Sequence, residues 1–130
     1  MTSQTPAMRS RYLADTIHTA SPAKLLMMLF DRLVLDLARG EQALLAGKRP
    51  EANLQLQHAQ DIISELHMSL DMDAWEGSPG LGQLYTFVVT ELVNANVHGN
   101  ATKVTECRSL IEPLRDTWRE AASAAVAVVE

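Results

Sequence analysis

The most constraining feature of the chain is the apolar run at residues 25–30, which opens a helix predicted over residues 23–45. At 3.6 residues per turn, one side of this helix carries a leucine stripe, with further apolar residues beside it. The stripe contains Leu26, Leu29, Leu33, Leu37 and Leu44, and the residues beside it are Leu25, Met28, Val34 and Leu35. Asp31, Arg32 and Asp36 interrupt the apolar residues of this helix. The helix therefore cannot span a membrane, which needs about 20 apolar residues in a row. A soluble helix with this much apolar surface is either sunk in a core or offers a groove to another molecule.

Composition favours one all-helical domain. The chain has 130 residues, of which 47% are hydrophobic and only 5% aromatic, and few segments alternate as strands do. The net charge of −5 argues against a nucleic-acid binder, which needs clustered Lys and Arg. A single cysteine, Cys107, rules out an internal disulfide and fits a reducing compartment. Residues 1–9 are polar and lack the apolar core of a signal peptide, so we expect a cytosolic protein.

Proline and glycine residues divide the chain into four long helices. Ser21-Pro22 and Ser78-Pro79 are helix-start signals, Pro50 restarts the chain, and Asn100 is predicted to cap the last helix. Gly47 and Gly99 are predicted to end helices. Similar lengths and short connections predict an antiparallel up-down four-helix bundle.

Each later helix carries its own apolar stripe. The stripe of the second helix contains Leu54, Ala59, Ile62, Ile63, Leu66 and Leu70. The stripe of the third helix contains Leu81, Leu84, Tyr85, Val88, Leu92 and Ala95. The stripe of the fourth helix contains Val104, Cys107, Ile111, Leu114, Trp118, Ala121 and Ala125. Gly40, inside the first helix, predicts a close helix neighbour, and Pro113 predicts a kink in the fourth. Before the bundle, Met8, Tyr12, Leu13 and Ile17 predict a short helical cap. The expected organisation is a flexible segment and cap at 1–20, the bundle at 21–125 and a tail at 126–130.

The sequence carries no sign of catalysis, so we expect neither an enzyme nor a cofactor or metal. No Glu is followed by His three residues later, which removes the di-iron bundle pattern, and the four histidines are scattered. We expect them at surface or capping positions. Cys107 is interpreted as an inert core thiol, and Tyr85 and Trp118 as core aromatics whose polar atoms reach the rim. Met27 and Met28 are either core filler or part of an adaptable peptide groove.

The sequence resembles that of the flagellar secretion chaperones, the FliS family. The resemblance covers residues 12 to 118. The matching pieces are Tyr12-Leu13, Thr19-Ala20-Ser21-Pro22, Lys24-Leu25, Met28-Leu29-Phe30-Asp31, Ala59-Gln60-Asp61-Ile62-Ile63, Glu65-Leu66, Ser69-Leu70-Asp71, Leu84-Tyr85, Leu92, Ala95-Asn96, Leu114-Arg115 and Trp118. The sequence departs from the family pattern in the loop at 75–80, at Gly99-Asn100 and at Pro113.

The resemblance implies a cytosolic chaperone that binds the C-terminal segment of flagellin. Such a chaperone prevents premature polymerisation and delivers the subunit to the flagellar type III export apparatus. The resemblance also implies contacts with the export gate and, in some bacteria, with an anti-sigma factor. Candidate client-binding residues combine the matching Tyr12 with its apolar neighbours and the widened helix faces: Tyr12, Leu13, Ile17, Leu25, Met28, Leu29, Ile62, Leu66, Leu84, Tyr85, Val88 and Asn96.

Two alternatives stay open at this point. The residues 12–17 form either a displaceable cover over the client groove or a permanently docked helix, and the resemblance favours the cover. The surplus apolar surface could instead make a structural homodimer or interaction scaffold, and a weak homodimer is also compatible with a chaperone.

Overall fold

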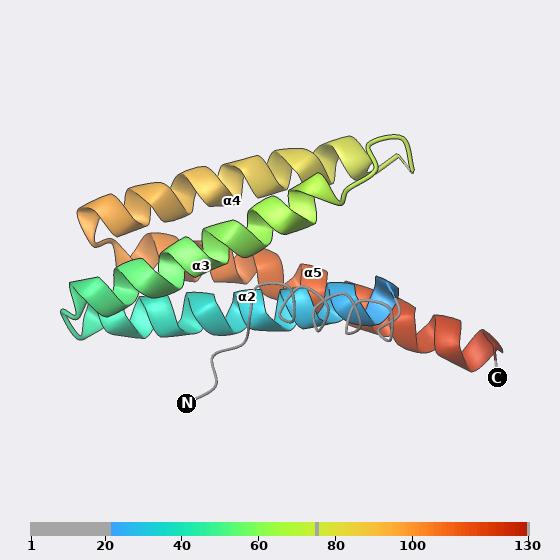
Figure 1. Cartoon of the computed structure of the whole chain (residues 1–130), viewed down its shortest axis with the longest axis horizontal. Coiled ribbons are helices and arrows are strands. Elements are labelled where there is room, and N and C mark those ends of the chain that lie inside the picture. The colour runs from blue at the N-terminus through green and yellow to red at the C-terminus, as the bar shows by residue number, and fades with distance from the viewer. Residues whose placement is uncertain (1–21, 75, 130) are drawn as a thin grey trace, which may run out of the picture.

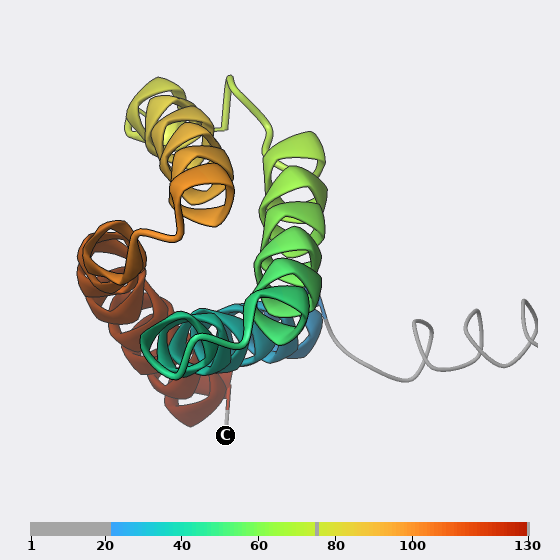
Figure 2. The same ribbon diagram turned by 90° about the vertical axis from the view of Figure 1, so that its left-hand side faces the viewer.

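The computed structural model describes residues 22–74 and 76–129, and these residues form four helices and no strand (Figure 1). The helices, labelled as in the figure, are α2 (Pro22–Leu45), α3 (Arg49–Met68), α4 (Ser78–His98) and α5 (Ala101–Val129). Consecutive helices run in opposite directions along the long axis. Viewed end-on, each helix packs between its two neighbours: α2 and α4 both contact α3 and α5 (Figure 2). The predicted up-down four-helix bundle is confirmed, while the predicted cap lies outside the described residues.

Glycine ends two of the helices as predicted. Gly47 has φ of 73° and Gly99 has φ of 66°, in the left-handed region that is costly for residues with a Cβ. Asn100 then accepts the backbone N–H of Lys103 through Oδ1 at 3.2 Å, which confirms it as a cap. The α3–α4 hairpin is therefore linked to α5 by a tight turn.

The predicted cap at Ser78 is wrong. The N-cap of α4 is Gly77, and Ser78 is already inside the helix with its side chain fully buried. No described atom forms a hydrogen bond with Ser78 Oγ. The helix begins one residue earlier than its Ser-Pro signal indicates, so the hydroxyl points inward and leaves the free N–H groups uncapped. The other Ser-Pro signal starts at Ser21, outside the described residues.

The predicted stripes meet in one core. Its largest fully buried side chains include Phe30, Leu33, Leu37, Leu56, Ile63, Leu92, Val104 and Ile111. Gly40 lies against α3 as predicted, because a Cβ built on it would be 2.7 Å from Leu56 Cδ2. Pro113 lies inside α5, which continues on both sides of it.

Asp36, which looks in the sequence like a polar interruption of the first helix, is fully buried. Its carboxylate accepts a hydrogen bond from Arg32 Nε at 2.9 Å, one turn earlier in α2, and also contacts His58 Nδ1 of α3. Both partners keep about half of their side chains exposed (49% and 48%). A buried carboxylate needs such partners, and the contact with His58 links α2 to α3. His58 thus has a specific partner that its sequence position did not reveal.

Candidate functional site

The apolar stripes are buried towards the end that holds the α2–α3 connection, the closed end, and become partly exposed towards the other, the open end. Along α5, Val104, Cys107 and Ile111 are buried, whereas Leu114 and Trp118 further on are only partly buried. Along α2 the order is reversed, since Leu26 is partly buried and Phe30 is fully buried. Because α2 and α5 are antiparallel neighbours, both changes fall at the same end. The apolar stripes therefore run past the point where the helices cover one another.

Two adjoining hollows at this open end form what we call the furrow. Their volumes are about 330 and 250 Å³, and Leu26 and Trp118 line both. One hollow lies between α2 and α5, and the other lies beneath the end of α3, the α3–α4 connection and the start of α4. The lining residues are Pro22, Ala23, Leu26, Met27, Leu66, Ser69, Leu70, Asp71, Ala74, Leu81, Tyr85, Trp118, Ala121 and Ala122. With Ser69 and Asp71 as the polar exceptions, the furrow offers an apolar surface where the start of α2, the end of α3 and the start of α4 meet the second half of α5.

Trp118 joins the two hollows, and its polar atom is buried, not at the rim as predicted. Its Nε1–H has no acceptor among the described atoms. A buried N–H without a partner costs about 1–3 kcal/mol, which the large ring must offset by its apolar contacts.

Tyr85 forms part of the furrow floor from α4. Only 2% of it is exposed, and its ring packs against His67 with centroids 5.8 Å apart. Burial raises the pKa of its hydroxyl to about 12, so the side chain stays neutral at physiological pH. The floor is thus an uncharged aromatic surface.

The furrow contains two of the predicted client-binding residues, Leu66 and Tyr85. Both are almost fully buried, so each presents only a small part of its side chain. Ile62 and Val88, predicted on the same spacing, lie wholly in the core, with 6% and 0% exposure.

The other predicted residues lie outside the furrow lining. Met28 is 50% exposed on α2, and Leu25, Leu29 and Leu84 are partly buried. Asn96 is at the other end of the bundle, where its Nδ2 donates to Asn53 Oδ1 at 2.7 Å. Tyr12, Leu13 and Ile17 lie outside the described residues.

Sequence reasoning missed Leu26, Leu70 and Trp118 as candidate site residues. All three were recognised as apolar stripe positions and assigned to the core. The available signal was their place near the ends of their stripes, where a bundle of unequal helices leaves side chains uncovered.

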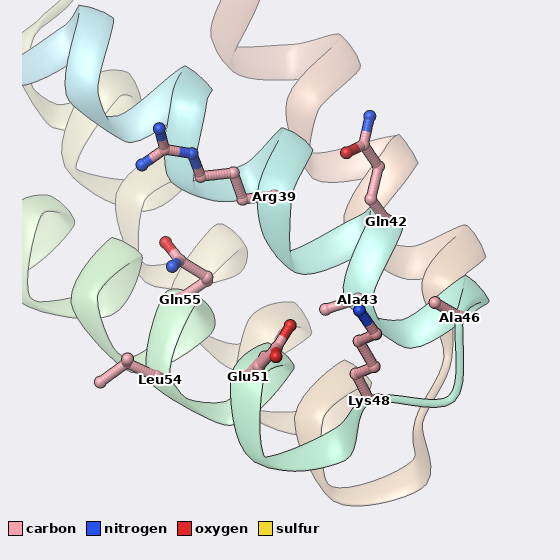
Figure 3. Close-up of a pocket in the computed structure, with 8 residues that line it drawn as sticks. All are labelled: Arg39, Gln42, Ala43, Ala46, Lys48, Glu51, Leu54 and Gln55. Atoms are coloured by element: carbon pink, nitrogen blue, oxygen red, sulfur yellow. The ribbon is translucent and has the colours of Figure 1, made fainter.

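A third hollow, of about 420 Å³, lies between α2 and α3 at the closed end (Figure 3). Figure 3 shows Arg39 and Gln42 reaching from α2, and Gln55 and Glu51 from α3. Lys48 adds a second cation, so the lining combines charges of both signs with amide groups. Ala43, Ala46 and Leu54 complete this mixed lining, whereas the furrow lining is almost wholly apolar, and the furrow is therefore the candidate site.

In the described residues the metal-ligating side chains are dispersed and the thiol is buried. Among them, no group of three or more His, Cys, Asp or Glu is placed to hold a metal ion. Cys107 is buried, and burial raises the pKa of its thiol to about 12, which agrees with the predicted inert core thiol. None of the described helices is long and apolar enough to cross a membrane.

Comparison with known proteins gives one consistent result. The family model described as "Flagellar protein FliS" matches residues 4–125. The flagellar secretion chaperone FliS of Bacillus subtilis (strain 168) is 28% identical over 110 residues, which cover 85% of this chain and 82% of the relative. The protein of the same name from Escherichia coli (strain K12) is 29% identical over 108 residues, covering 82% of this chain and 79% of the relative. A third flagellar secretion chaperone FliS, from Vibrio cholerae, is 29% identical over 103 residues, covering 78% of this chain and 76% of the relative.

Proposed function

Because the chain belongs to the FliS family of flagellar secretion chaperones, we propose that it binds the C-terminal segment of flagellin in the bacterial cytosol. In this proposal it prevents premature polymerisation and delivers the subunit to the flagellar type III export apparatus. The observation that carries the proposal is the furrow, an apolar surface that the described helices leave uncovered.

The furrow matches what binding an amphipathic segment requires. Such a segment buries an apolar face in a groove through residues spaced three and four apart. Ordering a disordered segment costs at least about 2–5 kcal/mol, which the burial of about 1,000–3,000 Å² offsets. The furrow alone is too small for that area, so we propose that the client also covers neighbouring apolar residues such as Met28 and Leu84. Leu66 and Tyr85 then contribute the floor of the site.

The test is binding of a peptide from the flagellin C-terminus, with a control peptide scrambled in its apolar spacing. The furrow variant is Leu26→Glu, which places a carboxylate against the indole of Trp118. The matched control is Leu45→Glu, because Leu45 lies on the same helix but is 73% exposed at the closed end. We expect Leu26→Glu to weaken binding at least about tenfold and Leu45→Glu to leave it unchanged. Equal binding of the native and scrambled peptides would refute the proposal.

We further propose that residues 12–17 cover part of the furrow when no client is present. What supports this proposal is that Pro22, the first described residue, lines the furrow. Deleting residues 1–17 should then increase the binding of a dye that reports exposed apolar surface. An unchanged dye signal with an unchanged circular dichroism spectrum would reject the cover.

The alternative function, a homodimeric scaffold, also has an observation in its favour. Met28 and Leu35 are 50% and 40% exposed and lie seven residues apart on α2. Sedimentation over a wide concentration range separates the two functions, because a client chaperone is able to exist as a monomer, whereas a structural homodimer stays associated on dilution. The export gate and an anti-sigma factor are further proposed partners on family grounds.

A further inference from the structure

The charges of the chain are divided unevenly between the two halves of the bundle. Residues 50–102, which form nearly all of the α3–α4 hairpin, contain no Lys or Arg. They carry seven acids: Glu51, Asp61, Glu65, Asp71, Asp73, Glu76 and Glu91. All eleven Lys and Arg lie outside this stretch, together with the other nine acids. The α3–α4 hairpin is therefore acidic, whereas the rest of the chain is nearly neutral.

Four of these acids lie where the hairpin borders the furrow. Glu65 is in the last turn of α3, and Asp71, Asp73 and Glu76 belong to the α3–α4 connection. All four are exposed, and none forms an ion pair with a described Lys or Arg. Asp71 lines the furrow directly, and its Oδ1 accepts the backbone N–H of Asp73 at 2.9 Å. We call these four residues the acidic wall.

Two arginines on the opposite side of the furrow are already paired. Arg119 of α5 forms an ion pair with Asp31 of α2, and Arg115 is 3.0 Å from Asp116. These pairs leave little net charge on the α2–α5 side. The acidic wall thus places four acids without a Lys or Arg partner among the described residues on one side of the furrow, and it gives the two sides different electrostatic potentials.

Resting on the proposed function, we propose that the segment held in the furrow is amphipathic with a basic flank. Its apolar stripe lies on Leu26 and Trp118, and its Lys or Arg residues face the acidic wall. A segment with an acidic flank would meet repulsion at the same place. Exposed rim charges of this kind select the partner and its orientation, and their effect is screened by salt.

The experiment uses two synthetic amphipathic peptides with identical apolar spacing, one with Lys and one with Glu on the flank. Each is titrated into the full chain at about 50 mM and about 500 mM salt, which changes the screening length severalfold. The wall variant Glu65→Lys/Glu76→Lys is compared with Glu51→Lys/Glu106→Lys. The second variant changes net charge by the same amount, but at exposed positions near the closed end.

We expect the Lys-flanked peptide to bind about five- to tenfold more tightly at low salt and the ratio to approach one at high salt. The wall variant should lose or reverse the preference, and the control variant should keep most of it. Equal binding of the two peptides at low salt, or equal effects of the two variants, would overturn the inference while leaving the proposed function intact. Failure of the flagellin segment itself to bind would refute the proposed function and the inference with it.

Discussion

Gly40 offers a sharp test of the helix packing, through the variant Gly40→Ala. An added Cβ would be 2.7 Å from Leu56 Cδ2 and 3.1 Å from Leu56 Cγ, closer than ordinary van der Waals contact. Leu56 is fully buried, so it cannot move aside without disturbing the core. The clash should push α2 and α3 apart around Gly40.

Two opposing effects set the magnitude. Alanine stabilises a helix interior relative to glycine by about 0.5–1 kcal/mol. Overpacking a core costs about 1–3 kcal/mol. The difference predicts a loss of about 1 kcal/mol in the free energy of unfolding, measured by urea denaturation followed by circular dichroism.

Gly80→Ala is the control, because Gly80 is also helical and a Cβ there meets nothing within 4 Å. It should be neutral or stabilise the protein by up to about 1 kcal/mol. In a Leu56→Ala background, Gly40→Ala should become stabilising, since the clashing atoms are gone. If Gly40→Ala stabilises the wild-type chain as much as Gly80→Ala does, the close approach of α2 and α3 is refuted.

Four further predictions concern three buried polar groups. Burial raises the pKa of the Cys107 thiol from 9.0 to about 12. At pH 8 the thiol should therefore react with a thiol reagent about a thousandfold more slowly in the native chain than in the unfolded chain. Equal reaction rates would contradict its burial. Because of the same shift, the native state holds the thiol proton more tightly than the unfolded state does. The contribution of Cys107 to stability should therefore be lost as pH rises from about 9 towards 12. Urea denaturation of the wild type and of Cys107→Ala over this pH range measures that loss. Ser78→Ala removes a buried hydroxyl without a partner and should be neutral or stabilising, whereas a loss above about 1 kcal/mol would mean that the hydroxyl is satisfied in solution. Asp36→Ala should cost about 1–3 kcal/mol by removing the contacts to Arg32 and His58, and no change in the urea midpoint would rule out that link.

Helix number, order and most boundaries follow from local signals in the sequence. Gly47 and Gly99 end helices because only glycine adopts their left-handed backbone cheaply, and this constraint is readable from one residue. The buried state of Asp36 is not local. Its partner His58 is 22 residues away on another helix, and only the fold brings them together.

The candidate site was only partly predictable for a related reason. Leu66 and Ile62 share one stripe, yet the first lines the furrow and the second is enclosed in the core. Residue spacing identifies the face of a helix that turns inward. The neighbouring helices stop covering that face at a point that depends on their relative lengths and on where they end. The apolar stripe of one helix carries no information about that point.

The central claim is that a flagellin segment binds in the furrow, and methyl NMR of the full chain tests it most directly. The chain is titrated with the flagellin C-terminal peptide while methyl signals at both ends of the bundle are followed. Shifts should be largest at furrow residues such as Leu26 and Leu70, and small at Leu45 and Val97, which are exposed at the closed end. Binding accompanied by unchanged furrow signals, or by shifts centred on Leu45 and Val97, would contradict the claim.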